Sequence, residues 1–433
     1  MFEIKDQLKQ VEKALLIGVY TEAAERAEAE SLLEELGALV DTLGLRIAER
    51  LAVRVPQASP RYFVGSGKAE EIAARAAELG VDVIVFDNDL HPAQQRNWEA
   101  LAKLAVIDRQ EIILDIFAQR AQTKEARLQV SLARLEYSLP RLTRAWGHLS
   151  RQGGGLGGKG EGESQLETDR RLVRKQIDRL KAALHLVRSR RATQRKHRER
   201  LPLPHAAIVG YTNAGKSSLL KKLTGADVLV ENKLFATLDT TTRKISLPTE
   251  QDLLLTDTVG FVRNLPHRLV EAFKATLEEA VLADFLVHVL EASHPRVYDF
   301  FDTTMRLLRE LGADDKRIIT VLSKADLVQN ESTRHALRVH FPDAIFVSTE
   351  TGEGLDQLLF RMSDMLTDRV QRVELALPLD RTDLLSLLHR TSNVLSLDYQ
   401  PGFVAVTAAV SPKVLARVEP FLLRRKAGVQ PAL

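Results

Sequence analysis

A glycine-rich turn between a buried strand and a helix is the stretch of this sequence best suited to do chemistry. The segment is AAIVGYTNAGKSSLL, and its central part fits the pattern G-x-x-x-x-G-K-S. Backbone N–H groups of such a turn point at phosphates, and the positive end of the following helix dipole adds to their field. Lys216 would reach the β- and γ-phosphates, and the Ser217 hydroxyl would bind Mg²⁺. The pattern predicts a nucleotide-phosphate site formed by Gly210, Tyr211, Thr212, Asn213, Ala214, Gly215, Lys216 and Ser217.

Two later strand ends carry acidic residues that suit the same ligand. In LLLTDTVGF, Asp257 can hold the Mg²⁺ shell and the Gly260 N–H can bond a γ-phosphate. In VLSKADL, the Asp326 carboxylate can accept from N1–H and N2–H₂ of guanine, a pair of donors that adenine lacks. Three motifs in this order predict a guanine nucleotide. With the loop of FVSTETGEG, the assigned residues are Asp257, Thr258, Val259, Gly260, Ser323, Lys324, Ala325, Asp326, Ser348, Thr349 and Glu350.

The segment LFATLDTTTRKI, between the first two motifs, should contain a switch threonine. Such a threonine binds Mg²⁺ only when a γ-phosphate is present. Thr237 and Thr240 to Thr242 all fit this role, and each could instead supply only a turn hydroxyl. The residue chemistry alone leaves the choice open.

The position after D-x-x-G holds Phe261, where Ras-like enzymes place a Gln that orients the attacking water. A phenyl ring cannot do this, so the catalytic residue is unknown from the sequence. Two interpretations of Phe261 stay open: a core aromatic beneath the switch, or a hydrophobic gate beside the γ-phosphate. Under both, we expect slow hydrolysis by the isolated protein and a need for an activating partner.

Alternating strands and helices must position these motifs. From His205 to about Asp368 the pattern is that of a doubly wound domain. Upstream, ALLIGVY, LAVRV, VDVIVFDNDL and AVIDRQ are strand-like, while the run from Glu22 to Leu43 and PAQQRNWEALAKL are helix-like. After Val373, VELALP, DLLSLLHR, FVAVTAAV and KVLARVEPFLL suggest strand, helix, strand and helix.

A heptad pattern links the first domain to the nucleotide domain. Apolar residues step by 4 and 3 from Leu128 to Leu149 and again from Leu166 to Val187, on either side of GGGLGGKGEGE. An antiparallel helical hairpin with a glycine tip is the simplest structure for this pattern. Pro140 should kink the first arm. The second arm is strongly basic, and LPLP at 201–204 ends it.

We therefore expect a multidomain α/β protein. Its parts would be an N-terminal α/β domain (1–116), a basic helical hairpin with a Gly-rich tip loop (117–200), a Ras-like P-loop G domain (201–370) and a small C-terminal α/β domain (371–433).

Composition restricts the class of protein. Hydrophobic residues make up 45% and charged residues 27%, as in ordinary globular proteins, and the net charge is +3. With no cysteine, disulfides and thiolate zinc sites are excluded. No apolar run reaches the roughly 20 residues that span a bilayer, and ALLIGVY is too short and too close to acids to be a signal peptide. We expect a cytoplasmic protein.

Several longer segments resemble the HflX family of GTPases, within the Obg–HflX-like superfamily. They are FATLDTTTR, DTVGFVRNLPHRLVEAFKATLEE, VIDRQEIILDIFAQRAQTKEARLQVSLARLEYSLPRL and LSRQGGGLGGKGEGESQLETDRR, and the likeness runs from about Tyr62 to Gly354. It implies a ribosome-stimulated GTPase that associates with the large (50S) subunit and splits stalled ribosomes. It also implies Thr237 as the Mg²⁺ ligand within a GTP-binding switch formed by Phe235, Ala236, Thr237, Leu238 and Asp239.

Three residues depart from the family pattern. Ser323 stands where the family has Asn, Thr349 where Ala is usual, and Glu291 where Asp is usual. The family Asn bonds the base and braces the phosphate loop, so Ser323 should weaken guanine affinity. We expect all three to be tolerated.

The glycine tip already has a candidate role. It lacks a preceding strand and a G-K-[ST], so it should not bind a nucleotide. Glycine lets a backbone approach RNA closely, and flanking arginines neutralise phosphates. The resemblance implies that the tip points to the peptidyl-transferase region; the alternative is a mobile, solvated loop beside a charged helix face. The rRNA contacts would be Arg151, Gly153, Gly154, Gly155, Gly157, Gly158, Lys159, Arg170, Arg171 and Arg174.

The expected partners are GTP, Mg²⁺ and the large ribosomal subunit with its rRNA, bound by a monomer without a membrane-spanning segment. Peripheral membrane association stays open. Two other functions also stay open: an RNA remodeller that uses ATP as well, and a signalling GTPase whose basic arm is only a solvated face.

Overall fold

The computed structural model describes residues 11–142, 161–198, 203–225, 234, 235, 237–248, 251–264, 279–366, 371–410 and 412–423. Within the helix 161–198, side chains are described for residues 167–187. The chain forms two compact units. The first consists of Met1–His185, Glu231–Asp239 and Val262–Lys274, and the second consists of Leu186–Val230, Thr240–Phe261 and Ala275–Leu433.

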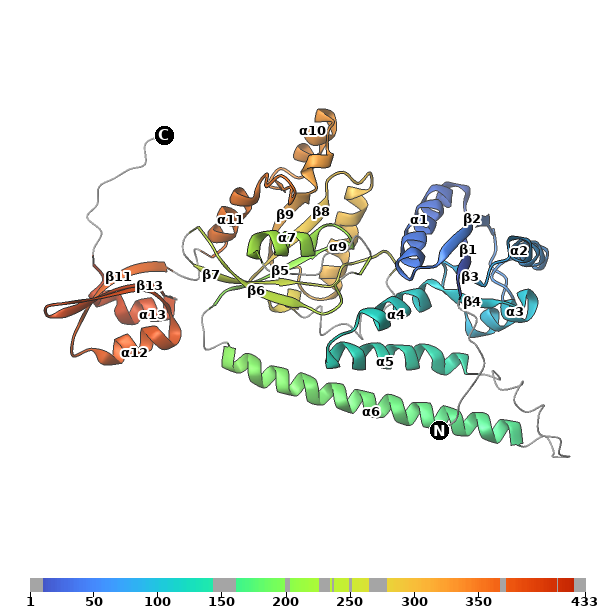
Figure 1. The fold of residues 1–433 in the computed structure, drawn as a ribbon, viewed down its shortest axis with the longest axis horizontal. Helices are drawn as coiled ribbons and strands as arrows, with labels where there is room; N and C mark the ends of the chain where they lie inside the picture. Colours follow the sequence, from blue (N-terminus) through green and yellow to red (C-terminus); the bar gives the residue numbers. More distant parts are fainter. Residues whose placement is uncertain are drawn as a thin grey trace. The chain divides into compact units, whose positions relative to one another are not determined.

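The first unit contains a four-stranded parallel sheet in the order β2-β1-β3-β4 (Figure 1). Its core includes Leu15, Ile17, Ile84, Phe86 and Trp98. All the strands and helices expected in this part of the chain are present, and α2 and α4 are additional helices. The elements are β1 (Lys13–Tyr20), α1 (Arg26–Thr42), β2 (Arg46–Arg54), α2 (Ser66–Leu79), β3 (Val83–Phe86), α3 (Pro92–Ala102), β4 (Ala105–Asp108) and α4 (Arg109–Arg120).

The predicted heptad seam joins α5 (Lys124–Ser138) to α6 (Glu161–Arg198), which lie side by side in Figure 1. The prediction that Pro140 kinks the first arm is wrong, because α5 ends at Ser138 and Pro140 lies in the 3₁₀ turn Leu139–Arg141. A proline ring clashes with the preceding turn and removes a donor, so here it ends the helix. The seam consists of Leu128, Leu132, Leu135, Leu139, Val173, Ile177, Leu180 and Leu184. Trp146, Leu149 and the tip residues 153–160 lie outside the described residues.

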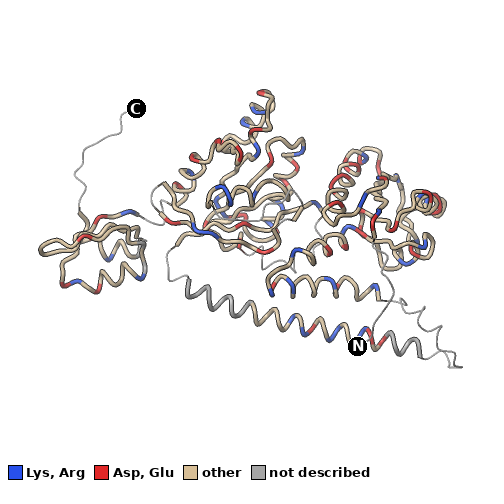
Figure 2. Tube along the Cα trace, in the orientation of Figure 1, with Lys and Arg blue, Asp and Glu red and all other residues tan. Residues whose placement is uncertain are grey.

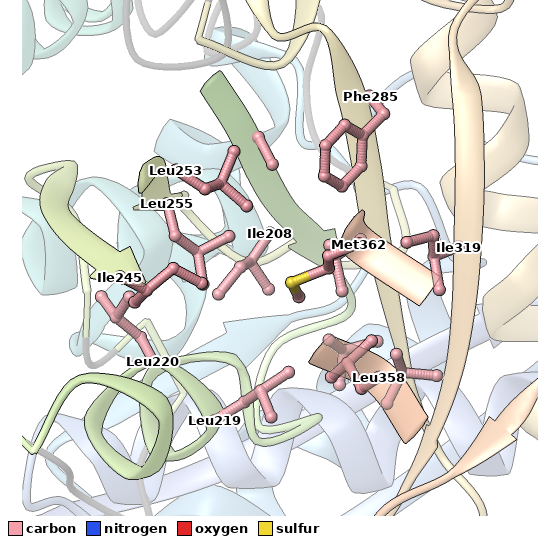
Figure 3. Close-up of a cluster of buried hydrophobic side chains, with 14 of the residues drawn as sticks. Ile208, Leu219, Leu220, Ile245, Leu253, Leu255, Phe285, Ile319, Leu358 and Met362 are labelled. Atoms are coloured by element: carbon pink, nitrogen blue, oxygen red, sulfur yellow. The ribbon is translucent and has the colours of Figure 1, made fainter. Parts of the chain in front are cut away.

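The second unit contains a six-stranded sheet in the order β10-β9-β8-β5-β7-β6, in which only β6 runs antiparallel to its neighbour. Figure 3 shows part of its core, where Ile208 of β5, Leu255 of β7 and Phe285 of β8 gather with Leu219 of α7 and Met362 of α11. The elements are β5 (His205–Gly210), α7 (Lys216–Thr224), β6 (Thr241–Ser246), β7 (Asp252–Asp257), β8 (Phe285–Glu291), α9 (Val297–Glu310), β9 (Arg317–Ser323), α10 (Glu331–His340), β10 (Ile345–Phe346) and α11 (Leu355–Asp364).

A small antiparallel sheet, β11-β13-β12, ends the described chain. The expected strand, helix, strand, helix order is present, with one further strand, β12. The elements are β11 (Gln371–Pro378), α12 (Thr382–Thr391), β12 (Asn393–Gln400), β13 (Phe403–Val410) and α13 (Pro412–Val418). Across the part of the chain that the structure describes, every helix is too short or too polar to cross a bilayer.

Candidate nucleotide site

Three predicted motifs meet at one edge of the second unit's sheet. β5 ends at Gly210, β7 at Asp257 and β9 at Ser323. β5 pairs with β7 in parallel, with Ile208 opposite Asp257, and β8 lies between β5 and β9. In open parallel sheets, ligands bind outside the carboxyl ends of the strands. The topology therefore gathers the sequence-predicted phosphate and base motifs at the edge where a nucleotide would bind.

Two glycines allow the loops at this edge to pack closely. Gly210 has φ +145°, and a Cβ there would overlap the carbonyl oxygen of Val289. At Gly260, a Cβ would lie 2.7 Å from the Thr212 methyl group and 2.9 Å from Lys216 Nζ. Any side chain at Gly260 would thus push into the phosphate loop. The predicted γ-phosphate N–H of Gly260 lies directly against this loop.

Lys216 is the first residue of α7, and its side chain is buried. Its Nζ donates to the Tyr211 carbonyl oxygen at 2.7 Å. Burial lowers the pKa of Lys216 to about 8, against an opposing effect of Asp257. A phosphate is a stronger acceptor than a carbonyl and would favour the charged amine. The Lys216 amine can therefore exchange the Tyr211 carbonyl oxygen for a phosphate oxygen as its acceptor.

Ser217 and Asp257 form the candidate metal site. The Ser217 hydroxyl donates to Asp257 Oδ2 at 2.5 Å, and Asp257 is fully buried. Mg²⁺ takes hard oxygen ligands, and it commonly uses one or two protein groups together with waters and substrate phosphates. No group of three or more His, Cys, Asp or Glu side chains suited to a metal occurs among the described residues. This donor set fits a magnesium ion that is shared with a nucleotide.

The base motif is held by neighbouring loops. Asp326 is exposed, and its Oδ1 accepts from the buried Ser348 hydroxyl at 2.5 Å. Lys324 has φ +55°, and its Nζ pairs with Glu291 Oε2 at 2.7 Å. Thus the substituted residue Glu291 still meets a member of the base motif. Of the remaining predicted base-loop residues, Thr349 is half-buried and Glu350 is exposed.

Phe261 is buried, with 1% of its surface exposed. Its backbone pairs with the phosphate loop: its N–H donates to Gly210 O at 3.1 Å, and its carbonyl accepts from Thr212 N–H at 2.8 Å. This burial favours the interpretation of Phe261 as a core aromatic. No role in orienting water follows from its position.

The predicted switch segment packs within the first unit. Phe235 lies edge-on to Phe117 with ring centroids 4.6 Å apart, and the Asp239 carboxylate accepts from the start of α5. Thr237 between them is half-buried, and Ala236 lies outside the described residues. Of the competing threonines, Thr242 is in β6, where its hydroxyl lies 2.8 Å from that of Thr256. That contact gives Thr242 a structural role.

Comparisons with known proteins cover nearly the whole chain. Family models match residues 30–118 (GTP-binding GTPase N-terminal), 120–198 (GTP-binding GTPase Middle Region) and 205–324 (50S ribosome-binding GTPase). The GTPase HflX of Akkermansia muciniphila is 49% identical over 437 residues, covering 98% of this chain and 100% of that protein. The chain belongs to the HflX family of GTPases. GTP hydrolysis is accordingly its enzymatic activity.

A second HflX protein, that of Escherichia coli strain K12, is 41% identical over 368 residues, or 85% of this chain and 86% of that one. Among solved structures, a GTP-binding protein from Sulfolobus solfataricus in complex with GDP has a TM-score of 0.43 at 22% identity, covering 82% of this chain and 99% of that one. Family membership follows from the sequence relatives.

A buried charge cluster in this HflX-family chain was not predicted from the sequence. Arg263, three residues after Gly260, pairs with Glu35 Oε2 of α1 at 2.8 Å and donates to the Ser31 carbonyl oxygen at 3.0 Å. Glu35 also pairs with Arg109, which pairs with Asp87 at 2.6 Å. The Arg263–Glu35 contact joins positions 228 apart. The position of Arg263, a charged residue three places after the D-x-x-G motif, was the only local sign of this cluster in the sequence.

Only part of the predicted rRNA-binding set is described. Arg171 and Arg174 on α6 are exposed and Arg170 is half-buried, whereas the tip residues and Arg151 lie outside the described residues. In Figure 2, positions held by Lys and Arg alternate with positions held by Asp and Glu along the described part of α6. One of these, Lys181, pairs with Glu136 of α5 at 2.8 Å.

Proposed function

We propose that this HflX-family GTPase binds the large ribosomal subunit and splits stalled ribosomes into subunits. GTP binding would favour the state that holds the large subunit, and hydrolysis would release it. The match of residues 205–324 to a model described as a 50S ribosome-binding GTPase supports the ribosomal partner. The exposed arginines of α6, opposite a seam that leaves them free of the core, support an RNA-facing surface.

In the proposed nucleotide complex, Lys216 leaves the Tyr211 carbonyl and pairs with the phosphates. Ser217 and Thr237 would hold Mg²⁺, with Asp257 accepting from its shell. The ion would neutralise charge on the phosphates during hydrolysis. Asp326, held by Ser348, would select guanine, as the exposed carboxylate beside a fixed hydroxyl allows.

Hydrolysis in this scheme needs help from outside the chain. Phe261 replaces the water-orienting glutamine of Ras-like enzymes and is buried with its backbone tied to the phosphate loop. The chain thus binds and orients the nucleotide, and the ribosome would complete the arrangement around the attacking water.

The observation that carries the RNA side of the proposal is the division of α6 into two faces. Val173, Ile177, Leu180 and Leu184 pack on α5, while Arg171, Arg174, Lys175 and Arg179 are exposed. Lys and Arg that contact phosphates release counterions, so binding through this face should fall steeply with salt.

Sedimentation of purified ribosomes with the full chain tests the proposal. With a non-hydrolysable GTP analogue, we expect the protein to travel with large subunits and 70S particles to decrease. With GDP, binding should be weak. Lys216→Ala, which removes the phosphate contact, is the matched control and should do neither. If the wild-type protein stays at the top of the gradient with every nucleotide, the ribosomal function is wrong.

A further inference from the structure

A carboxylate of the predicted switch segment binds the chain at the start of α5. Asp239 Oδ2 accepts from the N–H groups of Gln122 and Thr123 at 2.8 and 3.0 Å. Asp239 Oδ1 accepts from the Thr123 hydroxyl at 2.5 Å, and that hydroxyl itself accepts from Ala126 N–H at 3.1 Å. An anion at a helix N-terminus satisfies free N–H groups and interacts favourably with the helix dipole. Three direct hydrogen bonds therefore join Asp239 to Gln122 and Thr123 at the start of α5, and we call this set of contacts the clamp.

A second anchor holds the other end of the same segment. Phe235 has φ +55°, a conformation that is uncommon for a residue with a side chain, and it is 2% exposed. Its ring meets Phe117 of α4 at 77°. Leu238, next to Asp239, is also buried. The segment 235–239 is thus fixed at both ends to α4 and α5, with Thr237 between the anchors.

We propose that Asp239 is a positioning residue: through Thr123 at the start of α5, it fixes Thr237 for the γ-phosphate state and so sets the preference for GTP over GDP. The inference rests on the proposed role of Thr237 as an Mg²⁺ ligand. Two residues span at most about 7 Å, so holding Asp239 confines Thr237 to a small volume. Without the clamp, this part of the chain must be ordered anew each time GTP binds, at an entropic cost. GDP binding does not involve the switch threonine, so its affinity does not include this entropic cost.

The same clamp ties nucleotide preference to the helical hairpin. α5 carries half of the seam with α6, and its first residues bond Asp239. Coupling between two sites is reciprocal in free energy. A ligand that shifts the start of α5 must therefore change GTP affinity, and GTP must change the affinity for that ligand by the same factor.

The test measures affinities of the isolated full chain for GDP and for a non-hydrolysable GTP analogue with Mg²⁺, together with kcat and KM. Asp239→Ala, which removes all three hydrogen bonds, should weaken analogue binding about tenfold, within the usual range of allosteric coupling. Thr123→Val removes only the hydroxyl bond and should weaken analogue binding by a smaller factor, and both variants should leave GDP affinity unchanged. Both should lower kcat. Thr123→Ser, which keeps the hydroxyl, should behave as wild type. The double variant should be no worse than Asp239→Ala alone, because that variant already removes all three hydrogen bonds.

His91→Ala is the matched control, since His91 also caps a helix, α3, by accepting from Ala93 N–H, but touches no switch residue. It should leave both affinities unchanged. If Asp239→Ala weakens the analogue while Thr123→Val does not, Asp239 binds the nucleotide directly and the clamp proposal is wrong. Equal losses of GDP and analogue also overturn it. Thr237→Ala, measured alongside, reports on the proposed Mg²⁺ ligand separately, and no arm requires ribosomes.

Discussion

The Ser323 hydroxyl donates to the carbonyl oxygen of Ala214 at 2.7 Å, with the carbonyl of Leu290 at 2.9 Å as an alternative acceptor. The end of β9 therefore braces the phosphate loop. The asparagine usual in the HflX family at this position braces the loop and also bonds the base. Serine makes the first contact, and we expect its shorter side chain not to reach the base.

We expect Ser323→Asn to raise guanine-nucleotide affinity by about one hydrogen bond, or roughly 1 kcal/mol. Ser323→Ala should lower it, because the buried Ala214 carbonyl loses its donor. Calorimetric titration with GDP measures both changes. Equal affinities for all three proteins would show that the brace has no effect on binding.

Asp326→Asn should exchange guanine for xanthine preference. The amide reverses one donor–acceptor pair at the base edge, so GTP binding should fall roughly 100-fold while xanthosine triphosphate binding rises. Ser348→Ala, which removes the 2.5 Å contact to Asp326 Oδ1, should weaken GTP less. Competition binding with GTP, xanthosine triphosphate and ATP provides the measurement. A wild-type protein that binds ATP as tightly as GTP would contradict the role given to Asp326.

Nucleotide affinity should depend on pH through Lys216. Burial depresses its native pKa from 10.5 to about 8, so the free protein loses this proton above pH 8. The unfolded chain keeps the proton up to 10.5, so stability of the free protein should rise with pH between these values. Phosphates restore the charged amine, and at pH 8 GDP binding should take up about half a proton. Calorimetry in two buffers of different ionisation enthalpy measures this uptake, and zero uptake would rule out the shift.

Glu111→Gln should raise the free energy of unfolding at pH 8 but not at acid pH. Burial raises the pKa of Glu111 from 4.5 to about 7, with Tyr137 opposing and Asp108 adding to the shift. Because the native pKa lies above the unfolded one, this group favours folding below pH 4.5, and that contribution is lost as pH rises through 7. The variant should therefore gain about 1–3 kcal/mol at pH 8 and nothing at acid pH. Urea titrations at both pH values test this, and an equal change in the free energy of unfolding at the two pH values would contradict it.

Replacing Gly153–Gly162 by a short turn should leave GTP binding intact and abolish ribosome splitting. Residual large-subunit binding should persist through Arg170, Arg171, Arg174 and Lys175, with a salt slope lower by about one for each phosphate that the shortened protein no longer neutralises. Replacing Gly154, Gly155 and Gly157 with Val restricts the backbone at constant length and should give a milder loss. Splitting at the wild-type rate by the shortened protein would make the tip a mere connector.

The nucleotide motifs could be predicted from the sequence because each lies within a few residues of one strand end. Gly210, Asp257 and Ser323 are the last residues of β5, β7 and β9, so the local sequence pattern suffices to place them. The contacts of the switch segment could not be predicted in this way. Asp239 meets Thr123 across 116 positions, and no periodicity records which surface a distant loop will meet.

Two of the missed elements, α2 and β12, have weak local patterns. The buried face of α2 consists of Ala69, Ile72 and Ala76, so its apolar period is faint. β12 has largely exposed or half-buried residues, including Tyr399 at 69% exposure, and lacks the apolar run of a buried strand. Pro140 correctly indicated an interruption of the helix, but the predicted kink was wrong, since a helix can end as well as bend at proline.

The first unit is assembled from three separate stretches of chain, and this has a consequence for how the protein is made. Domains usually fold from the N-terminus as synthesis proceeds. Here Glu35 and Arg109 are synthesised long before Arg263, their common partner in the buried cluster. The hydrogen bonds from Gln122 and Thr123 to Asp239 likewise form only after Asp239 has been synthesised. The N-terminal unit can therefore complete its folding only after the phosphate loop has been synthesised, and the order of assembly differs from the order of the chain.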